Sequence, residues 1–429
     1  MTTPPASLAA STLAQKLIAR ASGRAQVQAG EIVNCRVDMA MFHDSSGPRR
    51  LKPMLEELGA QIWDKSRVVL VMDHYVPETN EESRRIVRIA RDWAREQALP
   101  HVYDSQGICH VVVPQGGHIR PGMFCVGGDS HSPTGGAFGA YMFGIGATEM
   151  LGVVVTGEIW LRVPETIAMH WSGQLGAGVC AKDMMLAMIA RFGMNGANYQ
   201  AVEFTGAAVR ALPMQERMTL CNMSAELGAQ TGLVAPDATT RAWLAQRPGG
   251  DRHVEPAGLA SDPGSVDVQH NFDADTLSPQ LAAPHSPAHG VAIADHADTR
   301  IDIAYIGACT GAKLDDLRFA ARVLRGRKVA AGVQLLVAPA SLQDRAQAEL
   351  EGTLQALTDA GASILPSACG ACAGYGTSFG EGQTVISSTA RNFKGRMGPV
   401  STRVFLGSAY TVAAAALCGR ITDPREVVQ

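Results

Sequence analysis

Residues 304–313 read Ala-Tyr-Ile-Gly-Ala-Cys-Thr-Gly-Ala-Lys, a short apolar run that passes directly into a glycine-rich turn carrying Cys309. Val68–Met72 (VVLVM) has the same form, and Asp73 and His74 follow it at once. Short apolar runs bounded by polar or glycine-rich turns are typical of strands buried on both faces. These two segments therefore predict buried strands that end in turns carrying functional side chains.

Stretches with a helical pattern alternate with the apolar runs along the chain. Glu81–Glu96 and Leu314–Leu324 are examples, and Ser11-Thr12 precedes another such stretch as an N-cap does. A third apolar run, Ile364-Leu365, comes shortly before Cys369-Gly-Ala-Cys372. Alternating strands and helices predict an α/β architecture, in which ligands gather at the carboxyl ends of the strands. We therefore expect the functional residues on the loops that follow strands.

Composition limits both the class of protein and its partners. The chain has 429 residues, of which 46% are hydrophobic and 18% are charged, so it is able to bury a large core. At ~150 residues per domain, about three domains are expected. A formal charge of −3 and the lack of a concentrated Lys/Arg stripe predict no nucleic-acid partner.

The N-terminal sequence and the number of cysteines bear on where the protein is located in the cell. Polar residues interrupt the N-terminal sequence MTTPPASLAASTLAQKLIAR, and no apolar stretch approaches the ~18–20 residues needed to cross a bilayer. The nine cysteines are an odd number, which favours free thiols or metal ligands in a reducing compartment over a disulfide framework. The sequence therefore predicts a cytoplasmic protein with no membrane partner.

Three cysteines lie in turns suited to holding a metal. Cys309 stands in GACTGAK, and Cys369 and Cys372 form a C-x2-C pair among small residues. Thiolates on tight loops suit zinc or an iron–sulfur cluster, although a C-x2-C alone is also compatible with a redox pair, half a zinc site or chance. Free cysteine is commonly a small buried hydrophobe. We expect that role for the other six cysteines, Cys35, Cys109, Cys125, Cys180, Cys221 and Cys418.

Several longer segments resemble one family, in the family's own order along the chain. They are GICHVVVPQGG, GGDSHSPTGGAFGAYMFGIGATEM, ERMTLCNMSAELGAQTG, SPQLAAPHSPAHG, GACTGAKLDDL, ILPSACGACAGYG and TARNFKGRMG. They are similar to segments of the aconitase and 3-isopropylmalate dehydratase large-subunit family. The similarity runs from about Leu13 to near the C-terminus, and several independent motifs in one order make it specific.

The resemblance implies a fold and its division. It implies three α/β domains of the aconitase type around an iron–sulfur cluster, at 1–165, 166–285 and 286–429, without the fourth, swivelling domain. Residues 247–299 are rich in Pro, His, Asp and Gly, and read alone they are typical of a linker. The resemblance replaces that interpretation, because the stretch contains the family's proline-rich entry to the cluster domain.

The resemblance also implies a cofactor, one [4Fe-4S] cluster held by Cys309, Cys369 and Cys372. Three thiolates leave one iron without a protein ligand. That open iron can bind a substrate hydroxyl and carboxylate as a Lewis acid, whereas a fourth cysteine would leave only electron transfer.

Removing water further requires groups that take and deliver protons. Read singly, an Asp–His pair in a turn is more often a hydrogen-bonded structural feature, and a helix glutamate is more often solvated. The matching motifs nevertheless imply acid–base and polarising roles for Asp73, His74, His110, Asp129, Ser130, His131 and Glu226. If the segment is helical, Asn222 shares a face with Glu226 and lies near the cluster.

The resemblance also implies that two arginines bind the carboxylates of the substrate. Arg391 and Arg396 match the arginines of the family's NRNFxGR segment, and guanidinium groups bind carboxylates bidentately. His43 matches a substrate-contacting position more loosely. The implied substrate is a small hydroxy di- or tricarboxylic acid, and its identity stays open.

The chain departs from the family pattern at three positions. Gly311 and Ala390 stand where the family has asparagines, which implies the loss of hydrogen-bond donors near the cluster and the substrate. Gln115 stands where the family usually has a glutamate. The GSSRE-like loop of single-chain aconitases does not occur in the sequence, so we expect a separate small subunit that completes the site. Two alternatives remain: a non-catalytic iron-sensing or RNA-binding derivative of the scaffold, and a zinc enzyme built on the same cysteines.

Overall fold

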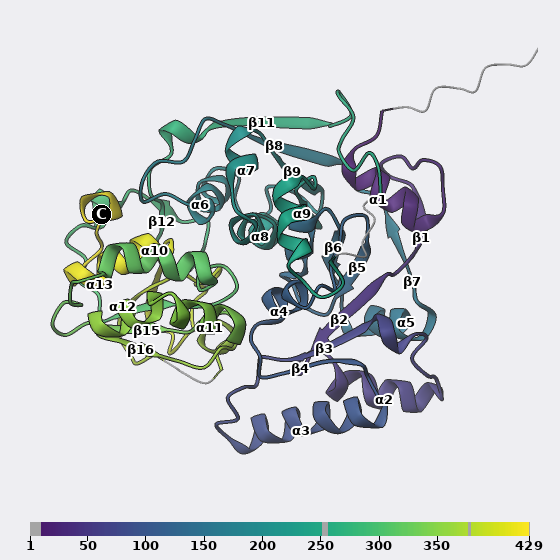
Figure 1. Cartoon of the computed structure of the whole chain (residues 1–429), viewed down its shortest axis with the longest axis horizontal. Helices are drawn as coiled ribbons and strands as arrows, with labels where there is room; N and C mark the ends of the chain where they lie inside the picture. Colours follow the sequence, from purple (N-terminus) through teal and green to yellow (C-terminus); the bar gives the residue numbers. More distant parts are fainter. Residues whose placement is uncertain (1–9, 251–255, 376–378, 429) are drawn as a thin grey trace, which may run out of the picture.

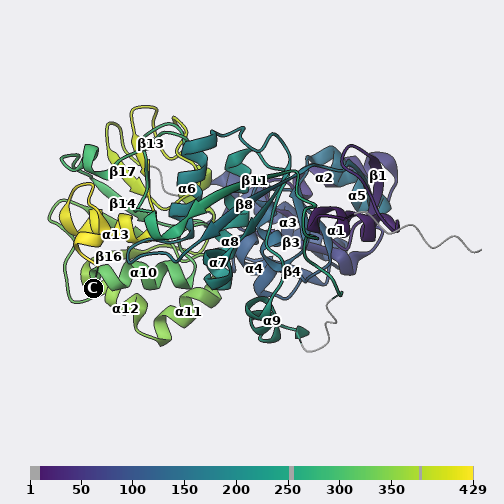
Figure 2. The ribbon, with the colours of Figure 1, turned by 90° about the horizontal axis from the view of Figure 1, so that it is seen from above.

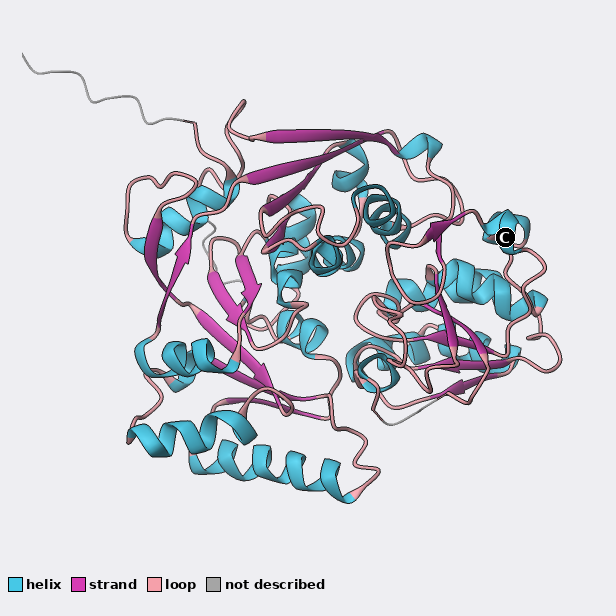
Figure 3. Cartoon of the chain, turned by 180° about the vertical axis from the view of Figure 1, so that it is seen from behind, coloured by secondary structure: helices cyan, strands magenta, loops and turns pink. Residues whose placement is uncertain are grey.

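Parallel β-sheets form the framework of the chain, and helices pack around them (Figure 1). The computed structural model describes residues 10–250, 256–375 and 379–428. Viewed from above, helices α10 and α13 lie at one end of the molecule and α1, α2 and α5 at the other (Figure 2). Figure 3 shows helices on both sides of the strands and long strands along one outer edge of the molecule. The expected α/β class is confirmed.

The first sheet contains five parallel strands in the order β4-β3-β2-β5-β6. Their bounds are His101–Asp104 (β4), Val68–Met72 (β3), Met39–His43 (β2), Phe124–Gly127 (β5) and Tyr141–Gly144 (β6). Val68 and Leu70 pack into one core cluster with α3 (Glu81–Glu96), whereas Val69 and Val71 pack into another with α4 (Cys109–Gln115). Both faces of β3 are therefore covered, which explains its continuous apolar run.

Further helices and a separate pair of strands flank this sheet. The helices are α1 (Leu13–Ser22), α2 (Pro48–Leu58) and α5 (Ala147–Thr156). The N-cap of α1 is Thr12, whose side chain accepts from Gln15, in agreement with the sequence signal. Strands β1 (Ile32–Arg36) and β7 (Glu158–Arg162) form a separate antiparallel pair.

The second sheet has four parallel strands in the order β10-β9-β8-β11. Their bounds are Thr231–Leu233 (β10), Ala201–Thr205 (β9), Thr166–Ser172 (β8) and Val268–Asp273 (β11). The segments between them form α6 (Ala181–Phe192), α7 (Ala207–Ala211), α8 (Met214–Met223) and α9 (Ala238–Ala245). Helix α8 is buried along almost its whole length, so it carries polar side chains into the interior.

The third sheet has the order β13-β12-β18-β17-β14-β15-β16. Its strands are Gly290–Val291 (β13), Leu281–Ala282 (β12), Arg403–Leu406 (β18), Thr384–Ser387 (β17), Ile303–Ile306 (β14), Gln334–Val337 (β15) and Ala362–Ile364 (β16). All are parallel to their neighbours except the short β12 and β13. Its helices are α10 (Leu314–Leu324), α11 (Leu342–Leu350), α12 (Thr353–Ala360) and α13 (Ala409–Cys418).

Sequence patterns located several elements closely. The structure has a strand at Val68–Met72 and helices at Glu81–Glu96 and Leu314–Leu324, as expected. Residues 268–291 form β11, β12 and β13, so this stretch joins two sheets and is no simple linker. The three-domain division with boundaries near 165 and 285 stays a prediction. None of the helices in the described part of the chain has the length and apolar character that a membrane span requires.

Candidate active site

The carboxyl ends of neighbouring strands in the first sheet bring together most of the expected acid–base residues. His43 ends β2, Asp73 and His74 follow β3, and the segment 129–131 follows β5. These strands are adjacent and parallel, so their carboxyl ends meet at one edge of the sheet. His110 reaches the same edge from α4. The structure therefore unites residues that are far apart in the sequence.

Asp73 and His74 form a tightly held pair. The Nδ1 atom of His74 lies 2.7 Å from Asp73 Oδ1, and the other carboxylate oxygen of Asp73 accepts from the Cys109 backbone N–H. Burial alone would lower the pKa of His74, but Asp73, assisted by Asp129 and Asp44, raises it to about 10. His74 is therefore protonated at neutral pH. The His43 ring stacks on it at 3.8 Å between centroids.

Asp129 sits among four histidines, one of which is His74, whose Nε2 atom lies 3.7 Å from Asp129 Oδ2. His110 Nε2 lies 2.6 Å from Asp129 Oδ1, the His131 backbone N–H donates to the same oxygen at 2.8 Å, and His43 Nε2 is 3.5 Å from Oδ2. Burial would raise the pKa of Asp129, but His110, His131 and the nearby His43 ring hold it well below its usual range. Burial lowers the pKa of His110 despite this partner, so His110 is neutral where His74 is charged. Such opposed shifts are typical of groups that divide acid and base roles.

Glu226 connects the second sheet's helices to this cluster. Its Oε1 atom accepts from Arg391 Nε at 2.6 Å and lies 3.0 Å from His131 Nε2. Burial would raise the pKa of Glu226, but His131 and Arg391 lower it, so the side chain is a buried carboxylate. Arg391 also donates to Ser130 Oγ at 3.0 Å. Ser130 is exposed and thus lies at the edge of the cluster, whereas Glu226 lies inside it.

Asn222 and Glu226 share one helical segment, but the helix changes type between them. Helix α8 ends at Met223, and Ser224–Leu227 forms a 3-10 turn that carries Glu226. The expectation of one continuous α-helical face is therefore only partly correct. Asn222 Nδ2 donates to Cys309 Sγ at 3.2 Å and to Thr134 Oγ1 at 2.8 Å. The amide thus reaches the cysteine that the sequence analysis singled out.

The three expected cysteine ligands lie on strand-end loops of the third sheet. Cys309 follows β14, and Cys369 and Cys372 follow β16. The Cys369 backbone N–H donates to the Asp73 carbonyl at 2.9 Å, which joins the thiol loops to the acid–base cluster. Ala308, directly before Cys309, has φ of 69°, a left-handed conformation that costs free energy outside glycine and is common at functional sites.

The surroundings shift the pKa values of Cys309 and Cys372 in opposite directions. Burial raises the pKa of Cys309 to about 12, although the Asn222 hydrogen bond opposes it. A hydrogen bond from Cys369, together with nearby Arg396, holds the pKa of Cys372 at about 5. Buried thiols become thiolates when they ligate a metal. Of the other six cysteines, Cys418 is exposed, against expectation, and Cys35, Cys109, Cys125, Cys180 and Cys221 are buried.

The spacing of the ligand atoms tests which metal group the residues fit. A single tetrahedral zinc with Zn–S bonds of 2.3 Å requires sulfurs about 3.8 Å apart. In the described part of the chain, groups of ligand atoms within 4.8 Å of one another are His43, Asp44, Asp73, His74 and His110, Asp129, His131, and the three cysteines belong to neither. The three thiols are the all-sulfur donor set that suits an iron–sulfur group.

Unsatisfied polar atoms gather at the same place. His43 Nε2, Asn222 Oδ1, Glu226 Oε2 and Arg396 Nε are buried without a hydrogen-bond partner among the described residues. Leaving such atoms unpaired is costly, so each requires a partner that the folded chain does not supply. All four belong to residues that the sequence analysis assigned to the site. The site is therefore prepared for a bound polar molecule.

The departures from the family pattern have local explanations at two positions. A Cβ atom at Gly311 would lie 2.3 Å from the Ser388 side chain, and Ser388 Oγ instead donates to the Gly311 carbonyl. Gln115 Nε2 donates to Asp344 Oδ1 at 3.1 Å, where a glutamate would place a second carboxylate against the first. Ala390 is buried, and nothing in the structure explains why it replaces a larger residue.

Two buried lysines beneath the thiol loops escaped the sequence analysis. Lys182 Nζ donates to the carbonyls of Ser388 and Thr389 at 2.6 Å each. Lys313 Nζ donates to the Cys309 carbonyl at 3.1 Å and to Asp316 at 2.7 Å. Lys313 lies in the GACTGAK motif, which was a usable signal, whereas nothing local marks Lys182. Both ammonium groups brace loops that carry site residues.

Fold and site together define an α/β protein in which buried carboxylates, histidines, arginines and thiols converge on one place. The model of the aconitase family (aconitate hydratase) matches residues 15–419. The chain is 42% identical to the 3-isopropylmalate dehydratase large subunit 1 of Methanopyrus kandleri, over 96% of this chain and 99% of that protein. It is 41% identical to the probable methanogen homoaconitase large subunit of Methanosarcina mazei, over 91% and 99%.

The chain belongs to the aconitase family, which confirms the resemblance. It is accordingly an enzyme of the hydro-lyase class. Family membership implies an iron–sulfur cluster, and the name "large subunit" in these relatives implies a smaller companion chain.

Proposed function

We propose that the chain is the large catalytic subunit of a [4Fe-4S]-dependent hydro-lyase. Its substrate is a small hydroxy di- or tricarboxylic acid, of the 3-isopropylmalate, homoaconitate, methylmalate or maleate/citraconate type. The observation that carries the proposal is the gathering of unpaired buried atoms of His43, Asn222, Glu226 and Arg396 beside cysteine thiols. The names of the relatives support the class of acid and do not select one member.

Cys309, Cys369 and Cys372 are the proposed cluster ligands. When bound, the cluster supplies Lewis acidity at an iron that lacks a protein ligand, which makes hydroxide a better leaving group. Asn222, by donating to Cys309 Sγ, orients that thiol and lowers the cost of its negative charge. Lys313 braces the same turn through the Cys309 carbonyl.

Proton handling falls to the cluster at the first sheet's edge. His74 holds a proton at neutral pH and is the proposed donor to the departing hydroxyl, with Asp73 fixing its ring. Asp129 orients His110 and His131, which lie at the same edge. The unpaired Oε2 of Glu226 is placed to accept from the substrate hydroxyl.

Two roles remain to be assigned, the binding of the substrate carboxylates and the removal of the carbon-bound proton. Arg391 is held in place by Glu226 and Ser130, and Arg396 has a buried Nε without a partner, so both suit substrate carboxylates. Water removal also needs a base for the carbon-bound proton. We assign that base to a separate small subunit that closes the site.

A metal analysis tests the cofactor. The chain is purified without oxygen, and iron, sulfide and zinc are measured together with the visible spectrum. Brown protein with about four iron atoms per chain and spectral bleaching in air is the expected result. Colourless protein loaded with stoichiometric zinc favours the zinc alternative and overturns the proposal.

A substrate panel tests the reaction. The chain is assayed alone and with the small subunit encoded in the same genome, on unsaturated diacids whose ultraviolet absorbance falls as water adds. Activity is expected only from the pair. Arg391→Lys keeps the charge but loses the bidentate geometry, so KM is expected to rise about 10-fold to 100-fold while iron content stays unchanged. Full activity of the isolated chain contradicts the split site.

A further inference from the structure

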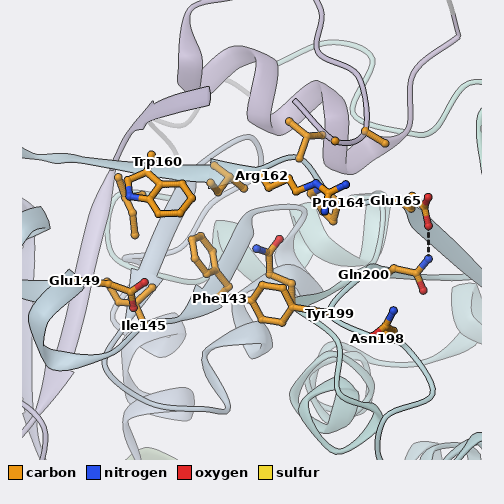
Figure 4. Close-up of a pocket in the computed structure, with 16 residues that line it drawn as sticks. Phe143, Ile145, Glu149, Trp160, Arg162, Pro164, Glu165, Asn198, Tyr199 and Gln200 are labelled. Atoms are coloured by element: carbon orange, nitrogen blue, oxygen red, sulfur yellow. Dashed lines mark hydrogen bonds between the residues drawn. The ribbon is translucent and has the colours of Figure 1, made fainter. Parts of the chain in front are cut away.

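A groove of about 520 Å³ runs beside the opening of the candidate active site (Figure 4). Residues 159–165 line it on one side, and Phe143 and the segment 198–200 lie opposite. The neighbouring opening, of about 370 Å³, contains Asp129, Ser130 and Arg391. The two hollows share Ile145, Tyr199 and Gln230. The groove is therefore continuous with the mouth of the site.

Large aromatic side chains are exposed in this groove. Trp160 is 67% exposed and Tyr199 is 60% exposed, and both contribute rings to the groove (Figure 4). Ile32, 66% exposed, lies on β1, the strand that pairs with the one carrying Trp160. Exposed aromatic residues rimmed by polar groups mark protein–protein interfaces, where Trp and Tyr contribute most of the binding energy.

The backbone of Tyr199 is held in an unusual conformation. Its φ is 63°, and that of Asn198 is 40°, so two successive non-glycine residues occupy the left-handed region. The strain is maintained by a hydrogen bond from the Tyr199 N–H to the Gly228 carbonyl at 2.7 Å. Most of the Tyr199 residue is nevertheless exposed, at the point where the two hollows meet. Strained backbone of this kind is common at functional sites.

The strand along the groove also has an open edge. Strand β7 carries Trp160 and pairs with β1 alone among the described residues. Backbone N–H and C=O groups on the other edge of such a strand are open to an additional segment. Pro164, two residues beyond the strand, lines the same groove. The groove thus offers aromatic anchors beside a strand for which the structure describes a single neighbouring strand.

We propose that this groove, centred on Trp160 and Tyr199, is the docking surface for the small subunit. The inference rests on the proposed function, which assigns part of the catalytic group to that subunit. The small subunit must cover the opening that contains Asp129 and Arg391, and the groove extends directly from it. A second copy of this chain would cover the opening without supplying the missing base. Arg162, Glu149 and Glu165 provide both signs of charge around the apolar centre.

Affinity measurements with the purified small subunit test the inference. Dissociation constants are measured by titration calorimetry for the whole large chain and its variants. Trp160→Ala is expected to raise Kd about 30-fold, the threshold effect for a hot-spot residue. Tyr199→Asn, which tolerates the left-handed backbone, is expected to raise it about 10-fold. Leu350→Ala, at a side chain that is 82% exposed on α11, is the matched control and leaves Kd within about twofold.

The outcomes separate the two proposals. Iron content of the isolated variants equal to that of the unmodified chain shows that folding and cluster binding are intact. Kd values of Trp160→Ala and Tyr199→Asn equal to that of Leu350→Ala overturn the docking surface, and the hydro-lyase proposal stands if the pair is still active. No association of the unmodified chains also overturns the docking surface. Tight, Trp160-dependent association without hydration of any acid in the panel supports docking and overturns the proposed reaction.

Discussion

The two halves of the candidate active site are built differently. In the acid–base half, each expected side chain has a partner from the chain itself: His74 has Asp73, His110 has Asp129, and Glu226 has both His131 and Arg391. In the sulfur half, Cys309 receives one amide hydrogen bond from Asn222. Burial meanwhile disfavours its thiolate. Over the residues that the structure describes, the chain thus pairs most of the acid–base half by folding, except for His43 Nε2 and Glu226 Oε2, and leaves the sulfur half to be completed by what it binds.

The difference has a physical cause. Carboxylate–imidazole pairs offset their own burial, because opposite charges in contact stabilise each other where water is excluded. Three thiolates repel one another and are stabilised only by a cation among them. The acid–base half should therefore survive removal of the metal group, and the sulfur half should not.

The largest effect is expected from Cys372→Ser. Replacing one of the three proposed ligands removes a sulfur donor, which is the donor that an iron–sulfur group prefers. Iron and sulfide content should therefore fall to background, and activity should fall at least about 10³-fold. Cys372 lies outside the α-helices and strands, so the circular dichroism spectrum should stay that of the unmodified chain. Cys418→Ser, at an exposed cysteine, is the matched control and should keep full iron content. Equal iron loss in both variants contradicts the assignment.

Asp129→Asn tests the other half, with a smaller effect. The substitution keeps the shape but removes the charge that His110 and His131 face, so kcat should fall about 10²-fold to 10⁴-fold, the range for general acid–base groups. Iron content should stay unchanged, in contrast to Cys372→Ser. Asp92, a partly exposed carboxylate on α3 outside the site, gives the control Asp92→Asn, which should retain activity. Coincident loss of iron in Asp129→Asn would show that the two halves are not separate.

The sequence predicted several strands and most residues of the candidate site, but it did not predict features that depend on tertiary packing. The apolar runs located β3 and β14, because buried parallel strands have a local signature, and motif order gathered His43, Arg391 and the cysteines into one site. Lys182 was missed because a buried ammonium group looks like any surface lysine until its neighbours are known. The exposure of Cys418 and the open groove at Trp160 depend likewise on tertiary packing.

Lys182→Met removes the ammonium group that holds the Ser388–Thr389 segment, and it should affect substrate binding less than the two preceding variants affect activity. Lys182 is fully buried, and burial lowers its pKa to about 8 despite the nearby charge of Asp316. Its loss leaves the Ser388 and Thr389 carbonyls unpaired and loosens the segment that leads to Arg391. KM should rise about 10-fold with a smaller change in kcat, because carboxylate binding depends on that segment. A pure loss of thermal stability with unchanged KM would show that Lys182 is structural only.

His118 provides the smallest effect and a contrast with the paired histidines of the site. Its ring contacts a hydroxyl and another imidazole: its Nε2 lies 2.7 Å from Tyr103 Oη, and the His101 ring stands edge-on at 4.5 Å. Burial first, then the charges of His101 and Arg120, lower its pKa to about 4. Because this folded-state value lies below the unfolded value of about 6.5, the unfolded chain binds the extra proton between these two pH values. Stability from this group should therefore be present above about pH 6.5 and be lost as the pH falls toward 4.

His118→Gln removes that titration and should flatten the acid limb of the Tm profile. The measurement is Tm by calorimetry at pH 7 and pH 4.5, and the fall in Tm between them should be smaller in the variant by a few degrees, the scale of about 1 kcal/mol in a chain of this size. His74 has the opposite shift, so its contribution is lost only as the pH rises toward about 10 and does not enter this window. Parallel Tm profiles for both proteins would mean that His118 is not neutral in the fold, and that burial without a carboxylate does not distinguish it from the histidines of the site.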